Sequence, residues 1–186
     1  MFKINTYLLR PHKELVTKFP DMHMHKVIAL YPDDCYINIQ DSFQMDNFKH
    51  NIEEDYNEYC VTISFNELNV VSFGFCGVEL WYSYIHLMNE YVQHGSAVEQ
   101  YGIDPIEFVL ETLDSNLVQF SIRYTNDNTL IAQANLPKRE FLSALLDGAK
   151  AYYATMLKYQ PNYARQYKRI AGLINDIESA VINKDK

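Results

Sequence analysis

The sequence is poor in the residues that break or loosen a chain. Glycine and proline number 6 each among 186 residues, which excludes collagen-like chains and chains dominated by flexible linkers. The few glycines form neither a phosphate-binding loop nor a dinucleotide-binding pattern. Hydrophobic residues make up 48% and charged residues 22%, which excludes disorder across the whole chain. We predict a single globular domain over residues 1–186.

Cysteines and long apolar runs are also scarce. The three cysteines, Cys35, Cys60 and Cys76, include no Cys-x-x-Cys pair. An odd number of unpatterned cysteines indicates free thiols in a reducing compartment. No segment approaches the roughly 20 apolar residues that a membrane-spanning helix needs, and the N-terminal residues lack the apolar run of a secretory signal. We therefore expect a cytoplasmic protein that does not bind a membrane.

Basic residues are missing from the middle of the chain. Between residues 27 and 122, Lys49 is the only lysine or arginine, set against 16 aspartates and glutamates. Residues 1–136 carry a net charge of −12 (7 basic, 19 acidic) and residues 137–186 a net charge of +4 (9 basic, 5 acidic), which together give −8. Such a surface repels nucleic acid, because nucleic-acid binding depends on neutralising phosphates. It attracts basic proteins and accelerates their encounter.

Alternating apolar residues predict strands over most of residues 1–80. Apolar side chains recur at every second position, which is the pattern of half-buried strands, and short connections favour antiparallel pairing. The intervening acidic residues 41–58 predict a long exposed loop or a short helix. The segments that alternate are residues 27–31, 35–40, 61–66 and 71–75.

Two helices are predicted within residues 81–114. The first places its apolar residues on one helical arc and ends at Gly95. The second is indicated by Asp104 as N-cap, Pro105 at the first helical position and Glu107 as the end of a capping box.

The last third of the chain predicts a hairpin and then a pair of helices. Residues 117–136 alternate on both sides of a turn at residues 126–128. Residues 138–182 carry an apolar stripe at helical spacing that is interrupted at Pro161, which indicates a helical hairpin. The predicted fold class is α+β: an antiparallel sheet with two central helices and a C-terminal amphipathic helix pair packed on one face.

Histidines occur twice at spacings that suit metal ligands. His23 and His25 would lie on one face of an extended segment, and a solvated or hydrogen-bonded pair is the alternative. His86, Glu90 and His94 would lie on one face of a helix, opposite its apolar stripe, and would face solvent or a partner rather than a closed pocket. No second ligand motif accompanies them, so we expect no metal and no other cofactor.

Cys76 lies in the sequence Gly74-Phe75-Cys76-Gly77. A tight turn there could expose its thiolate to a base such as His86. The alternative is a strand end at which Gly77 permits a bulge and the small thiol is buried. The glycine spacing departs from that of a hydrolase nucleophile elbow, so we expect no catalytic residue.

An acidic run that contains two tyrosines precedes the strand predicted at residues 61–66. It lacks the glycine and the alternation of a calcium-binding loop. A solvated loop is one interpretation, and a docking surface for a cationic partner, with the tyrosines supplying contact area, is the other. The predicted partner-binding residues are Glu53, Glu54, Asp55, Tyr56, Glu58 and Tyr59.

Strands predicted at residues 117–125 and 129–136 run directly into the helix start Leu136-Pro137-Lys138-Arg139-Glu140-Phe141. This arrangement resembles the ending of small cytoplasmic immunity proteins of bacterial polymorphic toxin systems. The resemblance carries over no site residue. It implies a non-catalytic protein that binds and neutralises a toxin, and an acidic surface suits a basic toxin domain.

The sequence thus supports three hypotheses of different classes. The leading one is a non-catalytic acidic protein-binding module, an immunity protein that neutralises a basic toxin by occlusion. The second is a structural or regulatory homodimer joined through its C-terminal helices. The third is a small enzyme that uses Cys76 or a metal held by histidine and glutamate.

Overall fold

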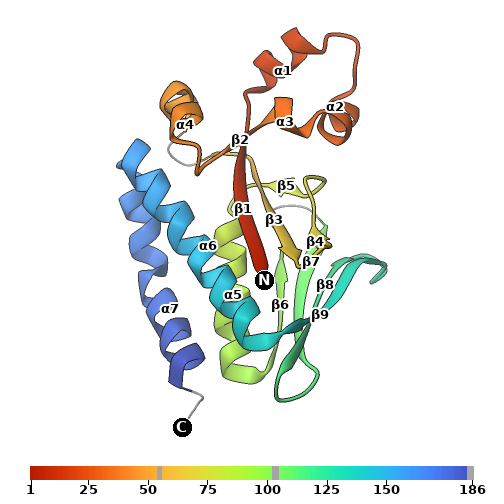
Figure 1. Ribbon diagram of the computed structural model, residues 1–186, viewed down its shortest axis with the longest axis vertical. Coiled ribbons are helices and arrows are strands. Elements are labelled where there is room, and N and C mark those ends of the chain that lie inside the picture. Colours follow the sequence, from red (N-terminus) through yellow and green to blue (C-terminus); the bar gives the residue numbers. More distant parts are fainter. Residues whose placement is uncertain (54–55, 102–104, 184–186) are drawn as a thin grey trace.

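The computed structural model describes residues 1–53, 56–101 and 105–183 of the chain. Two antiparallel sheets lie beside a layer of long helices, and a lobe of short helices extends from one end (Figure 1). The predicted α+β fold class is confirmed. Within the described part of the chain, no helix combines the length and the apolar character needed to cross a membrane.

The first sheet is built by the N-terminal half of the chain, and all of its pairings are antiparallel. Its main path has the order β2-β1-β3-β4, and the short strand β5 pairs with the remaining part of the β3 edge. The strands are β1 (Phe2–Leu9), β2 (Tyr36–Asn38), β3 (Tyr59–Phe65), β4 (Leu68–Val71) and β5 (Cys76–Gly77).

Both faces of the first sheet are buried. Val61 and Ile63 are fully buried on the face that enters the main hydrophobic core. Tyr7 and Cys60 lie on the other face and belong to a second, smaller cluster. Because side chains alternate between faces along a strand, the pairing of Tyr7 with Cys60 determines which residues enter each core.

A lobe of short helices covers the second cluster (Figure 1). Leu15, Val27 and Cys35, one from each helix, are fully buried there. The lobe comprises α1 (His12–Lys18), α2 (Met24–Leu30) and α3 (Pro32–Cys35). Two more short helices, α4 (Ser42–Phe48) and the 3-10 helix η1 (Lys49–Asn51), follow β2.

The second sheet is an antiparallel meander in the order β6-β7-β8-β9. It includes the hairpin predicted at residues 117–136, which is thereby confirmed, and Asn128 in its turn has a positive φ of 58°. Phe108 and Phe120 are fully buried on the face toward the helices. The strands are β6 (Ser96–Gln100), β7 (Ile106–Thr112), β8 (Leu117–Tyr124) and β9 (Leu130–Pro137).

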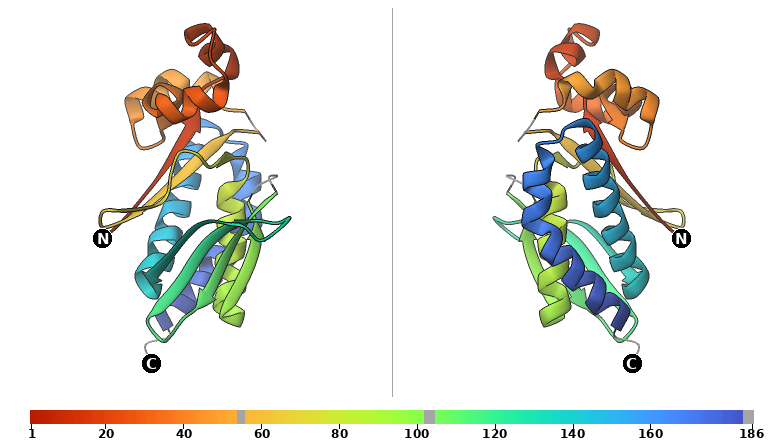
Figure 2. Two further views of the ribbon diagram at one scale, coloured as in Figure 1. Left: turned by 90° about the vertical axis from the view of Figure 1, so that its right-hand side faces the viewer. Right: turned by 90° about the vertical axis from the view of Figure 1, so that its left-hand side faces the viewer.

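The helix layer consists of α5 (Leu80–His94), α6 (Lys138–Tyr159) and α7 (Tyr163–Asn183), and α7 packs against both α5 and α6 (Figure 2). The first helix predicted within residues 81–114 and the C-terminal helix pair are confirmed. The apolar stripe of α7 is buried inside the chain, because Ile170, Ile174 and Ile177 are at most 2% exposed.

The second helix predicted within residues 81–114 is wrong, because Ile106–Thr112 forms strand β7. The predicted N-cap, Asp104, lies outside the described residues. Glu107, expected in a capping box, forms an ion pair with Arg123 of β8 instead. Every residue of β7 pairs with β8, so the strand satisfies its backbone groups along its whole length.

The strand predicted at residues 27–31 is also wrong, because most of it belongs to helix α2. Val27 is fully buried, whereas Ala29 and Tyr31 are exposed. A short helix with one apolar side therefore covers the second cluster, and the sheet gains no strand here. The strands predicted at residues 35–40 and 71–75 are shorter or shifted, since β2 ends at Asn38 and β4 ends at Val71.

Trp81 lies in the middle of the main core and is fully buried. Its indole Nε1–H donates to Thr6 Oγ1 at 2.9 Å, and its backbone N–H donates to the Tyr59 hydroxyl at 2.7 Å. Gly148 of α6 lies against the indole, where a Cβ would stand 2.6 Å from Trp81 Cη2. The close approach of α6 to α5 therefore depends on the absence of a side chain at residue 148.

Replacing Gly148 by alanine should destabilise the protein, whereas the same change at Gly172 of α7 should not. The new methyl at residue 148 has to displace a rigid indole, and overpacking of this kind costs about 1–3 kcal/mol. A Cβ at Gly172 would meet nothing within 4 Å, so Gly172→Ala should stabilise by up to about 1 kcal/mol through helix propensity. Urea unfolding followed by Trp81 fluorescence measures both effects, and equal changes for the two variants would contradict the close contact.

Candidate functional site

Residues 41–58, here called the acidic segment, connect β2 to β3 and contain most of the predicted partner-binding residues. The first part forms α4 and η1, so a short helix is present, as one of the two expectations had it. Met45, Phe48 and Ile52 are at most 6% exposed and belong to the main core. These side chains attach the acidic segment to the body of the protein.

Asp41 begins α4 as its N-cap. The backbone N–H of Gln44 donates to Asp41 Oδ1 at 3.0 Å, and Gln44 Nε2 donates to Asp41 Oδ2 at 2.9 Å. Both hydrogen bonds stabilise the ionised carboxylate and therefore lower the pKa of Asp41. The Asp-x-x-Gln spacing is a sequence signal for a helix start that the sequence reasoning did not use.

Two aromatic side chains of the acidic segment point into solvent. Phe43 is 77% exposed and Tyr56 is 52% exposed. Asp46, Glu53 and Glu58 are also exposed. Within the described part of the chain, no carboxylate of the acidic segment lies within ion-pair distance of a lysine, arginine or histidine. The segment thus presents aromatic contact area together with carboxylates that lack a cationic neighbour at this distance.

The acidic segment rests on the end of the C-terminal helix pair. Asn57 Nδ2 donates to the Tyr163 hydroxyl and to the backbone carbonyl of Glu53, both at 2.7 Å. The Glu53 N–H donates in return to Asn57 Oδ1 at 3.0 Å. Gln160 adds a 3.5 Å hydrogen bond to the carbonyl of Ile52. These bonds link the backbone of Ile52 and Glu53 to the end of the C-terminal helix pair.

The predicted partner-binding set is only partly exposed. Glu54 and Asp55 lie outside the described residues. Tyr59 is wrong as a surface contact, because it begins β3, is 2% exposed and stacks on Tyr152 with the ring centroids 4.9 Å apart. It shares its face of the strand with Val61 and thus enters the main core.

His23 and His25 do not form the pair that an extended segment would have produced. His23 is the N-cap residue of α2 and His25 lies inside that helix. Residues two apart in a helix do not share a face, so the arrangement that would have suited metal ligands does not form and the solvated alternative holds. Both side chains are exposed.

Glu90 and His94 are exposed on α5, as their spacing predicts, whereas His86 is half-buried. Nε2 of His94 is 3.5 Å from Oε2 of Glu90. The His86 ring lies 4.2 Å from the ring of Tyr82, centroid to centroid. In residues 1–53, 56–101 and 105–183, no group of three or more His, Cys, Asp or Glu side chains is placed to hold a metal ion.

Cys76 is half-buried in the short strand β5 and packs against the second cluster. It does not lie on a tight turn that exposes the thiol, so the strand end is the environment observed. Gly77 has little room for a side chain, because a Cβ there would lie 3.0 Å from Leu80 Cδ2. Cys35, Cys60 and Cys76 are all free thiols.

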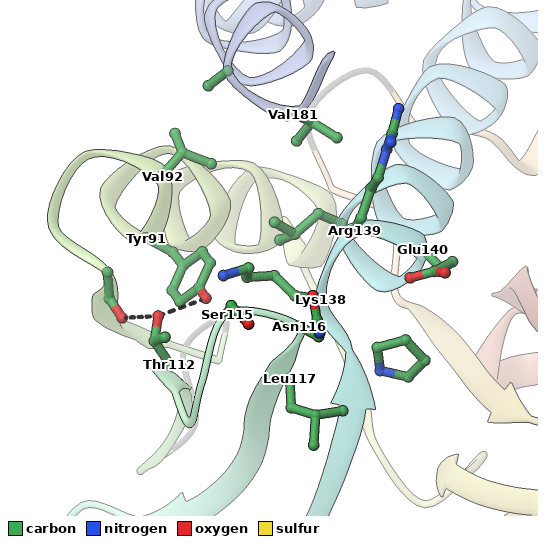
Figure 3. Close-up of a pocket in the computed structure, with 14 residues that line it drawn as sticks. Tyr91, Val92, Thr112, Ser115, Asn116, Leu117, Lys138, Arg139, Glu140 and Val181 are labelled. Atoms are coloured by element: carbon green, nitrogen blue, oxygen red, sulfur yellow. Dashed lines mark hydrogen bonds between the residues drawn. The ribbon is translucent and has the colours of Figure 1, made fainter. Parts of the chain in front are cut away.

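A pocket of about 630 Å³ lies where α5, α6 and α7 meet the connection between β7 and β8 (Figure 3). The hydroxyls of Tyr91 and Thr112 are 2.8 Å apart, and Thr112 Oγ1 donates to the carbonyl of Gly95 at 2.8 Å. Lys138 Nζ reaches the carbonyl of Asp114 at 3.5 Å. Sequence reasoning missed this pocket, because its walls come from distant segments that only the tertiary fold brings together.

The charge of this pocket is mixed. Lys138 and Arg139 stand beside Glu140 at the start of α6, and hydroxyl and amide groups from Ser115 and Asn116 complete the polar lining. The described lining residues include no histidine or cysteine, the usual base and thiol nucleophile. The arrangement can contact a polar ligand.

No protein-family model, no curated protein and no solved structure matches this chain. The contacts and charges of the described residues are therefore the basis of the functional proposal.

Replacing Asp41 by alanine should weaken α4 and lower the unfolding temperature at neutral pH. Asp41→Asn keeps an N-cap acceptor and should have a much smaller effect. Because the folded-state pKa of Asp41 is lowered from its usual 3.8, the carboxylate stabilises the fold above that value and loses this effect as the pH falls through the folded pKa. The difference between wild type and Asp41→Ala should therefore shrink in acid. Thermal unfolding from about pH 2 to pH 7 measures it, and a constant difference would contradict the cap.

Proposed function

We propose that this protein is a non-catalytic binding module that holds a basic protein partner against the acidic segment. In its specific form, the proposal is a cytoplasmic immunity protein that neutralises a toxin domain by occluding it. The single observation that supports it most is the combination of exposed Phe43 and Tyr56 with exposed carboxylates that have no ion-pair partner among the described residues. Exposed aromatic side chains together with carboxylates that form no ion pair are features that suit a partner of opposite charge.

The overall charge supports the first step, which is the encounter. Residues 27–122 carry 16 carboxylates and one basic residue, Lys49. Among the described residues of this range, Asp34 forms an ion pair with Lys18 and Glu107 forms one with Arg123. The electrostatic field of the other carboxylates attracts a basic partner over distances up to the Debye length and raises the association rate.

The hydrogen bonds that hold the described residues of the acidic segment support the second step, which is tight binding. Association loses less free energy when the contact residues are already ordered. The Asp41 cap fixes the start of α4, and Asn57 ties the backbone of Glu53 to α7. Phe43 lies in the capped helix α4, and Tyr56 directly precedes Asn57, which is bonded to Tyr163 of α7, so both side chains can serve as anchors for the partner.

The two other hypotheses have less support. A homodimer joined through the C-terminal helices would need a free apolar stripe, and the stripe of α7 is buried against α5 and α6 of the same chain. An enzyme that uses Cys76 would need a base that activates this half-buried thiol, and the Cys76 side chain packs against the apolar second cluster.

The double substitution Glu53→Lys with Glu58→Lys should weaken binding by about tenfold or more, chiefly through slower association. The control is Glu67→Lys with Glu111→Lys, which changes the net charge equally at exposed positions elsewhere, in the β3–β4 turn and on β7. The partner to test is the protein encoded by the adjacent upstream gene, co-expressed with this chain. A one-to-one complex that weakens with added salt is expected. No complex at low salt, or equal loss in both variants, would contradict the proposal.

The aromatic anchors are tested by Phe43→Ala with Tyr56→Ala. Removing two central contacts should speed dissociation about tenfold or more and leave the association rate nearly unchanged. Leu68→Ala with Leu130→Ala is the matched control, because these side chains are 52% and 51% exposed and lie outside the acidic segment. Surface plasmon resonance separates the two rates, and an unchanged dissociation rate in the aromatic variant would remove these residues from the interface.

A further inference from the structure

Two of the free thiols lie directly opposite each other in the first sheet. In the antiparallel pair formed by β3 and β5, Cys60 pairs with Cys76 and Tyr59 pairs with Gly77. Opposite residues in such a pair have their Cα atoms about 4.5–5.5 Å apart and their side chains on the same face. A disulfide requires Cα atoms about 4.4–6.8 Å apart, so the backbone already has the spacing that a bond between the two sulfurs needs.

The side chains around the two thiols show that both point into the same cluster. Cys60 is fully buried in the second cluster and Cys76 packs against it. The Tyr36 hydroxyl interacts with both thiols and also donates to the carbonyl of Phe73 at 3.3 Å. Cys35 belongs to the same cluster but lies at the end of α3, outside this strand pair.

The two thiols differ in access to solvent. Cys76 is half-buried, whereas Cys60 has no exposed surface. Burial raises the pKa of the Cys60 thiol, and the neighbouring Cys76 raises it further. An external reagent therefore meets Cys76 first, and Cys60 is placed to react only with a group already attached to Cys76.

We propose that Cys60 and Cys76 are a reversible modification site that closes to an intramolecular disulfide on reaction with a low-molecular-weight disulfide such as oxidised glutathione. The Cys76 thiolate attacks one sulfur of the reagent, a mixed disulfide forms, and one reagent thiol leaves. Cys60 then loses its proton and attacks the Cys76 sulfur, and the second reagent thiol leaves. The two protein thiols are oxidised by two electrons, the reagent disulfide is reduced to two thiols, and the two protein protons end on those thiols.

The bond would change how β5 is held. In the reduced protein this two-residue strand pairs with β3, and its Cys76 side chain also interacts with the Tyr36 hydroxyl of β2. The disulfide adds a covalent link shortly before α5, whose residue Trp81 carries the contacts to Thr6 and Tyr59. We expect the oxidised form to unfold at a higher urea concentration than the reduced form, since the link restricts the unfolded chain.

Treatment of the reduced, folded protein with oxidised glutathione tests the site directly. The thiol count should fall from three to about one per chain, and dithiothreitol should restore it. Digestion without reductant and mass spectrometry should show the Cys60 peptide joined to the Cys76 peptide. This measurement uses the natural chain, so it does not depend on whether any variant folds.

Three serine variants establish the order of the steps. Cys35→Ser should form the same link as the natural chain. Cys60→Ser should stop at a glutathione adduct on Cys76, whereas Cys76→Ser should react about tenfold more slowly because its remaining thiols are enclosed. The closing step should accelerate as the pH rises, because the Cys60 thiolate becomes more abundant.

Each contrary result would overturn the proposal. One is the persistence of three titratable thiols after treatment of the folded protein. Another is a link that includes Cys35 or joins two chains. A Cys60–Cys76 link that appears only in urea would show that the folded strand pair does not bring the sulfurs together.

Discussion

The burial of Trp81 is the contact on which the arrangement of the layers depends. Its indole and backbone donors are satisfied by Thr6 of β1 and Tyr59 of β3, so α5 is bonded to two strands of the first sheet at once. The ring also occupies the space beside Gly148, which sets how closely α6 approaches. Burying the indole without these partners would leave its N–H unsatisfied and would lower the free energy of unfolding. The sheet, α5 and α6 therefore constrain one another through this residue.

This arrangement also determines which apolar surfaces of the sheet and the helices are buried within the chain. The first sheet supplies one face to the main core and the other to the second cluster, and the stripes of α5, α6 and α7 are used inside the chain. Little apolar surface of the helix layer is left for a partner. The exposed aromatic residues of the acidic segment, Phe43 and Tyr56, are for this reason more informative than single exposed apolar residues usually are.

Apolar patterns within one segment of the sequence predicted the helices and strands whose formation depends mainly on local interactions. The apolar stripes of α5, α6 and α7 and the alternation of β8 and β9 are each contained within one element, and all five were predicted. Residues 106–112 carried both a capping signal and a strand alternation, and only pairing with β8 decides between them. Tyr59 could have been placed in the core, since it has the parity of Val61 and Ile63 on the same strand. The register that sets Cys60 opposite Cys76, and the four segments around the pocket, are not local properties and could not be predicted in this way.

The position of Tyr59 shows how the described end of the acidic segment is attached to the core. A polar loop is normally among the most mobile parts of a protein. Here the segment leads directly into Tyr59, whose hydroxyl is bonded to the Trp81 backbone in the centre of the core. Its other end begins at the Asp41 cap, and Asn57 ties it to α7 in between. A partner that binds Phe43 and Tyr56 would therefore contact side chains whose described neighbours are already bonded to the folded chain, and binding loses less free energy when contact residues are held in advance.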